Sequence, residues 1–134
     1  MMDANDVIKE VNTYLTGLLQ KDMDVYAASR HLVLAGGKRL RPLMVVRVYE
    51  ALGGDGREVI PAASSVELVH NFTLIHDDIM DNDDFRRGVP TVHKAYGVPL
   101  AILAGDLLFA LGYKAISDSK PFMEDERKFF RAVN

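Results

Sequence analysis

One long segment with helical spacing most constrains how this chain can fold. Across residues 58–81, apolar side chains follow helical spacing and surround much of the circumference. This pattern predicts a central helix that is buried on most sides. Pro61 lies in its first turn, where proline is tolerated, and at about 1.5 Å per residue the helix is roughly 35 Å long. Other helices are therefore expected to pack around it.

Helical spacing also predicts the neighbouring elements, and no segment shows convincing strand alternation. The first predicted helix covers residues 3–20, and Asp22 or Asp24 is expected to cap a second helix that stops at Gly36. Pro42 is expected at the first position of a third helix. The remaining expectations are a charged loop at residues 83–90, a helical turn at 91–96, and helices at 98–117 and 121–134. The predicted fold class is all-α, in one domain.

Composition excludes several classes of protein. With 134 residues, of which 49% are apolar, the chain is long and apolar enough to form one core. A net charge of −3 argues against nucleic acid as a partner. The absence of cysteine excludes disulfides and thiolate chemistry and is consistent with a cytoplasmic location. The polar N-terminus does not resemble a signal peptide, and no apolar run approaches the roughly 20 residues of a membrane span, because Gly105 and Asp106 interrupt the longest one.

The long predicted helix ends in a cluster of aspartates, Asp77, Asp78 and Asp81. Asp77 and Asp81 are four residues apart, so their carboxylates lie on one face at the negative end of the helix dipole. Like charges there are unfavourable, which favours a bound cation over a merely solvated surface, and oxygen ligands without thiols suit Mg²⁺. A calcium-binding EF-hand is excluded, because Phe85 and Arg86 occupy the fifth and sixth positions counted from Asp81.

A second motif, GGKRLRP at residues 36–42, has the physical character of a diphosphate-binding loop. Two glycines allow close approach to a ligand, and three cations then lead into the predicted helix start: Lys38, Arg39 and Arg41. Helix N-termini attract anions, and the arginine fork matches two phosphate oxygens. The Walker A pattern is absent. The alternative is a solvated basic turn after a helix, which is the better interpretation for any single cation but not for the whole motif.

Three further residues extend this chemistry. Arg86 and Arg87 directly follow the aspartate cluster and are expected to form the phosphate-binding half of the same site. His70 lies seven residues before Asp77, hence on nearly the same helical face, which makes a substrate contact plausible although a lone histidine is more often structural.

Taken in order, GGKRLRP, HDDIMD, DFRRGVPTVH and LAGDLL closely resemble the trans-type polyprenyl diphosphate synthases. These are the head-to-tail prenyltransferases that include farnesyl and geranylgeranyl diphosphate synthases. The resemblance runs over about residues 26–108 and implies an antiparallel helix bundle of the isoprenoid synthase type, usually in a homodimer. Terpene cyclases also carry DDxxD, but the GGKRLRP loop argues against a cyclase because it resembles the site for a second diphosphate substrate.

The resemblance implies a role for each predicted site residue. Asp77 and Asp81 would hold Mg²⁺ ions that bridge the allylic diphosphate, with Asp78 in support, and Arg86 would contact the same diphosphate. The diphosphate of isopentenyl diphosphate would be bound by Lys38, Arg41, His70 and Arg87, with Arg39 in a lesser role. The implied reaction is Mg²⁺-dependent ionisation of the allylic substrate, attack by the double bond of isopentenyl diphosphate, and proton loss.

Product length in this family is set upstream of the aspartate cluster. Phe72 and Thr73, an aromatic and a small residue, resemble the pattern of archaeal-type geranylgeranyl diphosphate synthases. The resemblance implies a C15–C20 product and favours geranylgeranyl diphosphate. The alternative is that Phe72 is simply a core residue.

The chain departs from the family in length and in one motif. Family members are roughly twice as long or more and carry a second Asp-rich motif on a later helix. No second DDxxD occurs here, and the acidic residues 124–126 do not substitute for it. The chain is therefore expected to be an N-terminal portion of a single synthase domain and inactive alone. The alternatives are a non-catalytic regulatory subunit that binds diphosphate or a full-length synthase, and a structural remnant.

Overall fold

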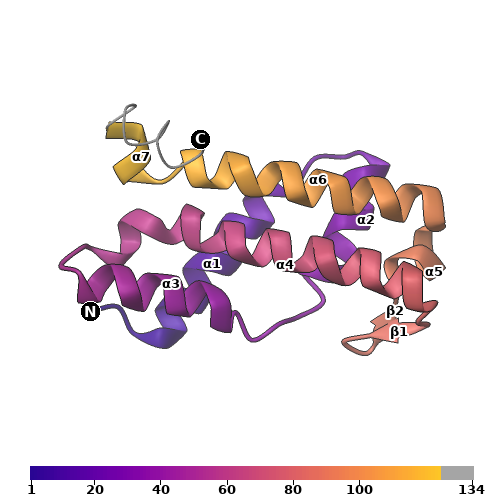
Figure 1. Cartoon of the computed structure of the whole chain (residues 1–134), viewed down its shortest axis with the longest axis horizontal. Helices are drawn as coiled ribbons and strands as arrows, with labels where there is room; N and C mark the ends of the chain where they lie inside the picture. Colours follow the sequence, from indigo (N-terminus) through magenta and orange to yellow (C-terminus); the bar gives the residue numbers. More distant parts are fainter. Residues whose placement is uncertain (125–134) are drawn as a thin grey trace.

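The computed structural model describes residues 1–124, which form a bundle of helices (Figure 1). The elements are α1 (Ala4–Leu18), α2 (Asp24–Val33), α3 (Leu40–Ala51), the 3₁₀ helix η1 (Gly56–Val59), α4 (Ile60–Asp81), β1 (Phe85–Arg86), β2 (Val89–Pro90), α5 (Val92–Tyr96), α6 (Val98–Ser117) and α7 (Lys120–Glu124). The predicted all-α class is confirmed, apart from the small hairpin.

The packing of α4 against α6 organises the bundle. The two helices lie side by side and run in opposite directions along the length of the molecule, joined at one end by the hairpin and α5 (Figure 1). Glycines on α6 permit the close approach. A Cβ added at Gly105 would lie 2.6 Å from His76 Nε2, and one at Gly112 would lie 3.0 Å from Val69 Cγ2. Larger residues there would push the helices apart.

The other helices cover this pair. α2 packs on α6, while α1 and α3 pack on α4. The hydroxyl of Tyr14 on α1 donates to Asp118 Oδ2 at 2.7 Å, and burial together with this bond raises the pKa of Tyr14. The largest side chains that are almost fully buried form the core: Leu15, Leu19, Leu32, Leu68, Ile75 and Leu108. Residues 58–81 therefore lie centrally, as the sequence predicted.

Several predicted boundaries were wrong by a few residues. α3 begins at Leu40, so Pro42 is its third residue and not its first. Neither predicted aspartate caps α2, because Met23 occupies the cap position without a side-chain bond. The segment before Pro61 forms η1 instead of the start of α4, and the Asp55 carboxylate caps that turn by accepting from the Arg57 amide. The helix predicted over residues 121–134 begins as α7, and its part beyond Glu124 lies outside the described residues.

The predicted charged loop contains an antiparallel hairpin. Phe85 pairs with Pro90 and Arg86 with Val89. Between them, Arg87 and Gly88 have positive φ angles of 55° and 76°, as expected for the two central residues of a type I′ turn. Each strand has only two residues, which is too short for alternation to be visible in the sequence. The hairpin places the two arginines in a defined geometry next to the end of α4.

The helix predicted at residues 98–117 forms as α6 with the same bounds, but it is more apolar than expected. By length and composition alone, α6 could cross a membrane, whereas the sequence predicted no run near that length. It carries Asp106 and Lys114, and its buried residues face a bundle in which α4 and α2 pack against it. Core helices of helical bundles have the same composition, so packing accounts for its apolar character.

The core predicts a contrast between two leucines of α6. Leu108 is fully buried, and Leu108→Ala is expected to lower the free energy of unfolding by about 2–5 kcal/mol because it leaves a cavity. Leu103 is 55% exposed, and Leu103→Ala is expected to change it by less than about 1 kcal/mol. Urea unfolding followed by circular dichroism measures both. Equal losses would contradict the placement of α6.

Candidate functional site

The aspartate cluster lies at the C-terminal end of α4 and faces two ways. Asp77 and Asp81 are exposed, whereas Asp78 is only 2% exposed. The helix ends directly after Asp81, because Asn82 takes a left-handed conformation with φ of 52°. The two exposed carboxylates lie one helical turn apart on the same side, as the sequence predicted.

Asp78, which was predicted to support the two metal-binding aspartates, is bonded to an arginine of the hairpin. Its carboxylate accepts two hydrogen bonds from Arg86, at 2.8 Å from Nε and 2.9 Å from Nη2. This bidentate pair raises the pKa of Arg86. Asp78 and Arg86, both predicted as catalytic, are therefore paired with each other, and their bond ties the hairpin to α4. The remaining Arg86 nitrogen, Nη1, is the part of the guanidinium outside this bidentate pair.

The two exposed carboxylates suit a divalent cation that is also coordinated by the phosphates of a bound substrate. Within residues 1–124, no group of three or more histidine, aspartate or glutamate side chains is arranged to hold a metal ion by itself. Two exposed carboxylates at the negative end of a helix still need a counter-charge. One or two carboxylates, with substrate phosphates supplying further oxygens, are the usual ligands of Mg²⁺. Asp77 and Asp81 fit that chemistry.

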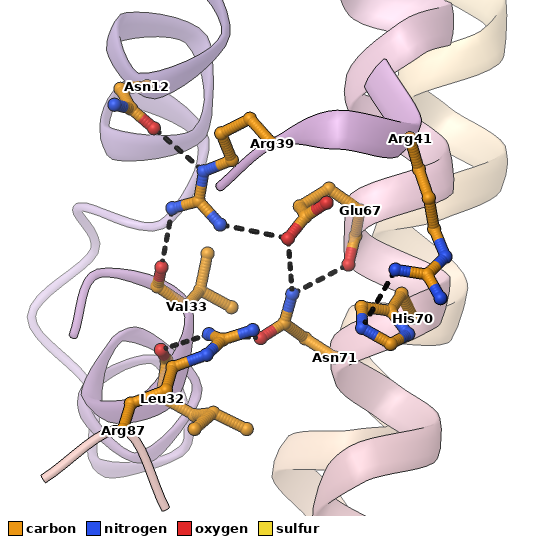
Figure 2. Close-up of polar contacts among 9 residues, drawn as sticks. All are labelled: Asn12, Leu32, Val33, Arg39, Arg41, Glu67, His70, Asn71 and Arg87. Carbon is orange, nitrogen blue, oxygen red and sulfur yellow. Dashed lines mark hydrogen bonds and ion pairs between the residues drawn. The ribbon is translucent and has the colours of Figure 1, made fainter. Parts of the chain in front are cut away.

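The GGKRLRP motif at residues 36–42, called the basic loop below, has cations both at the surface and in the interior. Lys38 and Arg41 are exposed, as ligand binding would require, but Arg39 is only 4% exposed. Figure 2 shows Arg39 among its protein partners. Its guanidinium donates to three protein groups: Glu67 Oε1 at 3.0 Å, the Val33 carbonyl at 2.6 Å and Asn12 Oδ1 at 2.8 Å. The predicted substrate-binding role of Arg39 therefore does not fit its geometry, since burial and these partners occupy the side chain.

His70 lies beside the exposed part of this loop. Its Nε2 is 3.3 Å from Nη1 of Arg41. Arginine can only donate, so this nitrogen must accept and the ring is neutral in that arrangement. Burial and the charge of Arg41 lower the pKa of His70. A neutral imidazole beside cations can donate through its other nitrogen to an anionic ligand, and the substrate contact of His70 stays a prediction.

Arg87, in the turn between β1 and β2, also contributes a cation near the basic loop. It is half-buried, and its Nη1 donates to the Leu32 carbonyl at 2.9 Å and to Asn71 Oδ1 at 3.0 Å. Burial and the charge of Arg39 lower the pKa of Arg87. The crowding of cations gives this region a positive potential, which favours an anion.

The two residues predicted to set product length lie further back along α4. The ring of Phe72 contacts those of His76 and Phe109, with centroid distances of 4.6 Å and 5.2 Å. Thr73 is exposed and donates its hydroxyl to the His70 carbonyl at 2.6 Å. Phe72 therefore sits between α4 and α6, and Thr73 faces outward.

Sequence reasoning missed four residues that hold this region together. Glu67 and Asn71 are buried on α4, Asn12 on α1 accepts from Arg39, and His31 on α2 lies 2.7 Å from the Pro90 carbonyl of the hairpin. A signal existed for the α4 pair, because helical spacing places Glu67 and Asn71 on the face that carries the apolar residues Leu68 and Ile75. Nothing in the sequence distinguishes Asn12 or His31 from surface residues.

Comparison with known proteins supports the predicted resemblance. A family model described as polyprenyl synthetase matches residues 23–133. The geranylgeranyl diphosphate synthase of Methanosarcina mazei is 58% identical over 123 residues, which cover 87% of this chain and 38% of that protein. The chain spans about two fifths of the length of such curated relatives.

Solved structures of similar proteins agree with the match to the family model. The geranylgeranyl pyrophosphate synthetase of the archaeon Geoglobus acetivorans has a TM-score of 0.82 and 51% identity, over 87% of this chain and 39% of that one. A polyprenyl synthase of Caulobacter crescentus, solved with calcium and isoprenyl diphosphate, has a TM-score of 0.79 and 36% identity, over 90% of this chain and 38% of that one. Because the family model matches most of its length, this chain belongs to the polyprenyl synthetase family.

Proposed function

We propose that this chain supplies the isopentenyl diphosphate site and one metal-binding wall of a head-to-tail prenyltransferase. The observation that carries the proposal is the position of two consecutive arginines in one hairpin. Arg86 pairs with the aspartate cluster, while Arg87 lies beside the basic loop, where a Cβ on Gly37 would be 3.4 Å from Arg87 Nη2. Two anion sites therefore meet at one turn, as a condensation of two diphosphates requires.

The residues divide between the two substrates. Lys38, Arg41, His70 and Arg87 bind the diphosphate of isopentenyl diphosphate. Asp77 and Asp81 would hold Mg²⁺, which would supply positive charge to stabilise the diphosphate leaving group. Arg86, whose charge is paired with Asp78, contributes on the same side the Nη1 donor that lies outside that pair. Carboxylates need this intervening metal, because they would otherwise repel the diphosphate.

The reaction needs no side-chain nucleophile. The bond between the allylic carbon and its diphosphate oxygen breaks, and the electron pair leaves with the diphosphate. The double bond of isopentenyl diphosphate donates its electrons to form the new carbon–carbon bond, and a proton is lost from the carbon beside the resulting cation. The products are a diphosphate ester five carbons longer, free diphosphate and a proton.

An apolar groove lies along α4 and α6, on the far side of Phe72 from the aspartate cluster. It has a volume of about 590 Å³ and is lined by α4 and α6 residues that include Val66, Val69, Phe109 and Tyr113. Phe72 touches Phe109 and lies on α4 between this groove and Asp77. In this proposal the growing tail extends from the metal-binding carboxylates along α4 and stops at the Phe72 ring, short of the groove, which fits a C15–C20 product and favours geranylgeranyl diphosphate.

Exposed apolar side chains support the predicted assembly. α6 exposes Ile102, Leu103, Phe109 and Tyr113, and α3 exposes Met44 and Val48. Exposed apolar side chains in this number favour burial against other protein, so the proposal includes a homodimer and the further helices of a synthase. A regulatory subunit that only binds diphosphate is the competing function.

Ligand binding to the 134-residue chain tests the proposal directly. Isothermal titration is expected to show binding of isopentenyl diphosphate without Mg²⁺ and of dimethylallyl diphosphate only with Mg²⁺. Lys38→Ala is expected to weaken only the first, about tenfold, because it removes one charge-assisted contact. Absence of both binding events would contradict the proposed site.

In the same preparation, radiolabelled isopentenyl diphosphate and Mg²⁺ are expected to give no product, since only one Asp-rich motif is present. Clear turnover by the chain alone would show that a second motif is unnecessary. Binding without turnover agrees with both the proposed function and the competing regulatory role. Activity of a longer chain that contains these residues would then support the proposed function, and inactivity would support the regulatory role.

The aspartates are expected to affect stability with opposite signs. Asp81→Asn removes a charge from the negative end of α4, which is expected to raise the free energy of unfolding by about 0.3–1 kcal/mol while abolishing Mg²⁺-dependent binding of dimethylallyl diphosphate. Asp78→Asn weakens the buried pair with Arg86 and is expected to lower the free energy by about 1.5–3 kcal/mol. Urea unfolding without metal measures both. Destabilisation by Asp81→Asn would argue for a structural role.

A change at Phe72 is expected to lengthen the product of a synthase that contains this chain. Phe72→Ala removes the ring that separates the allylic site from the groove, so chains longer than those of the parent enzyme are expected. Phe72→Tyr keeps the ring and is the matched control. Products are separated by reversed-phase chromatography after dephosphorylation. An unchanged product from Phe72→Ala would make Phe72 a core residue only.

A further inference from the structure

Two buried polar residues on α4, Glu67 and Asn71, join the basic loop to the hairpin turn (Figure 2). Glu67 is 3% exposed and Asn71 is fully buried, so neither has surface with which to contact a substrate. Buried polar groups are stable when protein groups satisfy them. Their partners therefore show what they hold in place.

Both polar atoms of the Asn71 side chain make hydrogen bonds. Its Nδ2 donates to the Glu67 carbonyl at 2.8 Å and lies 3.4 Å from Glu67 Oε1. Its Oδ1 accepts from Arg87 Nη1 at 3.0 Å. The donors and acceptors on either side leave one orientation of the amide, which in turn directs the guanidinium of Arg87.

Glu67 fixes the basic loop in a similar way. Its Oε1 accepts from Arg39 at 3.0 Å, and Arg39 is the residue directly before α3. Gly37 packs onto this pair, because a Cβ there would lie 2.9 Å from Arg39 Nη1 and 3.4 Å from Glu67 Oε1. The ion pair thus sets how the loop lies against α4 and Arg87.

Both arginines also occupy unusual backbone conformations. Arg39 and Arg87 each have a φ of 55°, in the left-handed region that bulky residues rarely adopt. Such residues persist when surrounding contacts hold them, and they cluster at functional sites. Here Glu67 and Asn71 supply part of those contacts, beside the Val33 and Leu32 carbonyls and the turn that contains Arg87.

We propose that Asn71 and Glu67 are positioning residues for the isopentenyl diphosphate site. Asn71 holds the guanidinium of Arg87 toward the diphosphate, and Glu67, through Arg39, holds the basic loop beside it. The inference rests on the proposed function and adds two residues that act through the binding arginines without touching substrate. It requires that loss of Asn71 weakens isopentenyl diphosphate binding only while Arg87 is present.

A double-mutant cycle in the 134-residue chain tests this requirement. Calorimetric titration with isopentenyl diphosphate compares Asn71→Leu, Arg87→Gln and the double variant. Each single variant is expected to weaken binding about tenfold, the loss of one hydrogen bond to a charged group. The double variant is expected to bind no more weakly than Arg87→Gln, because the two residues act as one unit. Multiplied losses, near a hundredfold, would overturn the proposal.

Two controls separate positioning from general damage. Leu108→Ala lowers stability from the core of α6 and is expected to leave isopentenyl diphosphate affinity unchanged. Mg²⁺-dependent binding of dimethylallyl diphosphate is expected to survive Asn71→Leu. If Leu108→Ala weakens isopentenyl diphosphate binding as much, or if Asn71→Leu weakens both ligands equally, the proposal fails. Asn71→Ser, which adds no apolar group to the core, replaces Asn71→Leu if the leucine variant does not fold.

A direct structural measurement keeps this inference distinct from the proposed function. If the parent chain binds no diphosphate, the proposed function is what fails. The Nε–Hε resonance of Arg87 in the nuclear magnetic resonance spectrum then decides the positioning claim. A single sharp resonance in the parent chain that broadens or shifts in Asn71→Leu supports it, and an unchanged resonance overturns it.

Discussion

The burial of Glu67 in the middle of α4 is the constraint on which the site depends. A carboxylate removed from water must be paired and hydrogen-bonded, because its desolvation costs several kcal/mol. Arg39 supplies the pair at 3.0 Å, reaching inward from the residue before α3. One ion pair therefore connects the start of α3, the basic loop and the central helix. Removing one partner would leave a buried charge and disturb all three.

α4 carries two polar stripes, and each serves a different purpose. His70, Asp77 and Asp81 form the stripe that faces the proposed substrates. The residues immediately after the first two, Asn71 and Asp78, are buried and accept hydrogen bonds from the consecutive arginines of the hairpin. A step of one residue turns a helix by about 100°, so neighbouring positions can bind ligand and support it. The helix thus couples both anion sites to one turn.

The end of α4 shows a conflict between stability and binding. Asp77 and Asp81 place negative charge where the helix dipole is already negative, which is unfavourable without a cation. The neighbouring Asp78 offsets part of this, because its carboxylate is buried in a bidentate pair with Arg86. Three aspartates within five residues therefore have two physical roles. The proposed metal site therefore lies at the end of the helix where aspartate charges are least favourable to helix stability.

The sequence alone determined the all-α fold class, the central place of residues 58–81, the family, and the common face of Asp77 and Asp81. These follow from helical periodicity and from motifs whose spacing is local. Only the tertiary structure decided that Arg39 faces inward, that Asp78 holds Arg86, and that residues 83–90 form a hairpin. Each of these depends on a partner distant in sequence or on a strand pair too short to leave a pattern. Periodicity places a side chain on a face of its own helix, but the packing of other helices decides which arginines of a basic motif bind ligand and which neutralise a buried carboxylate.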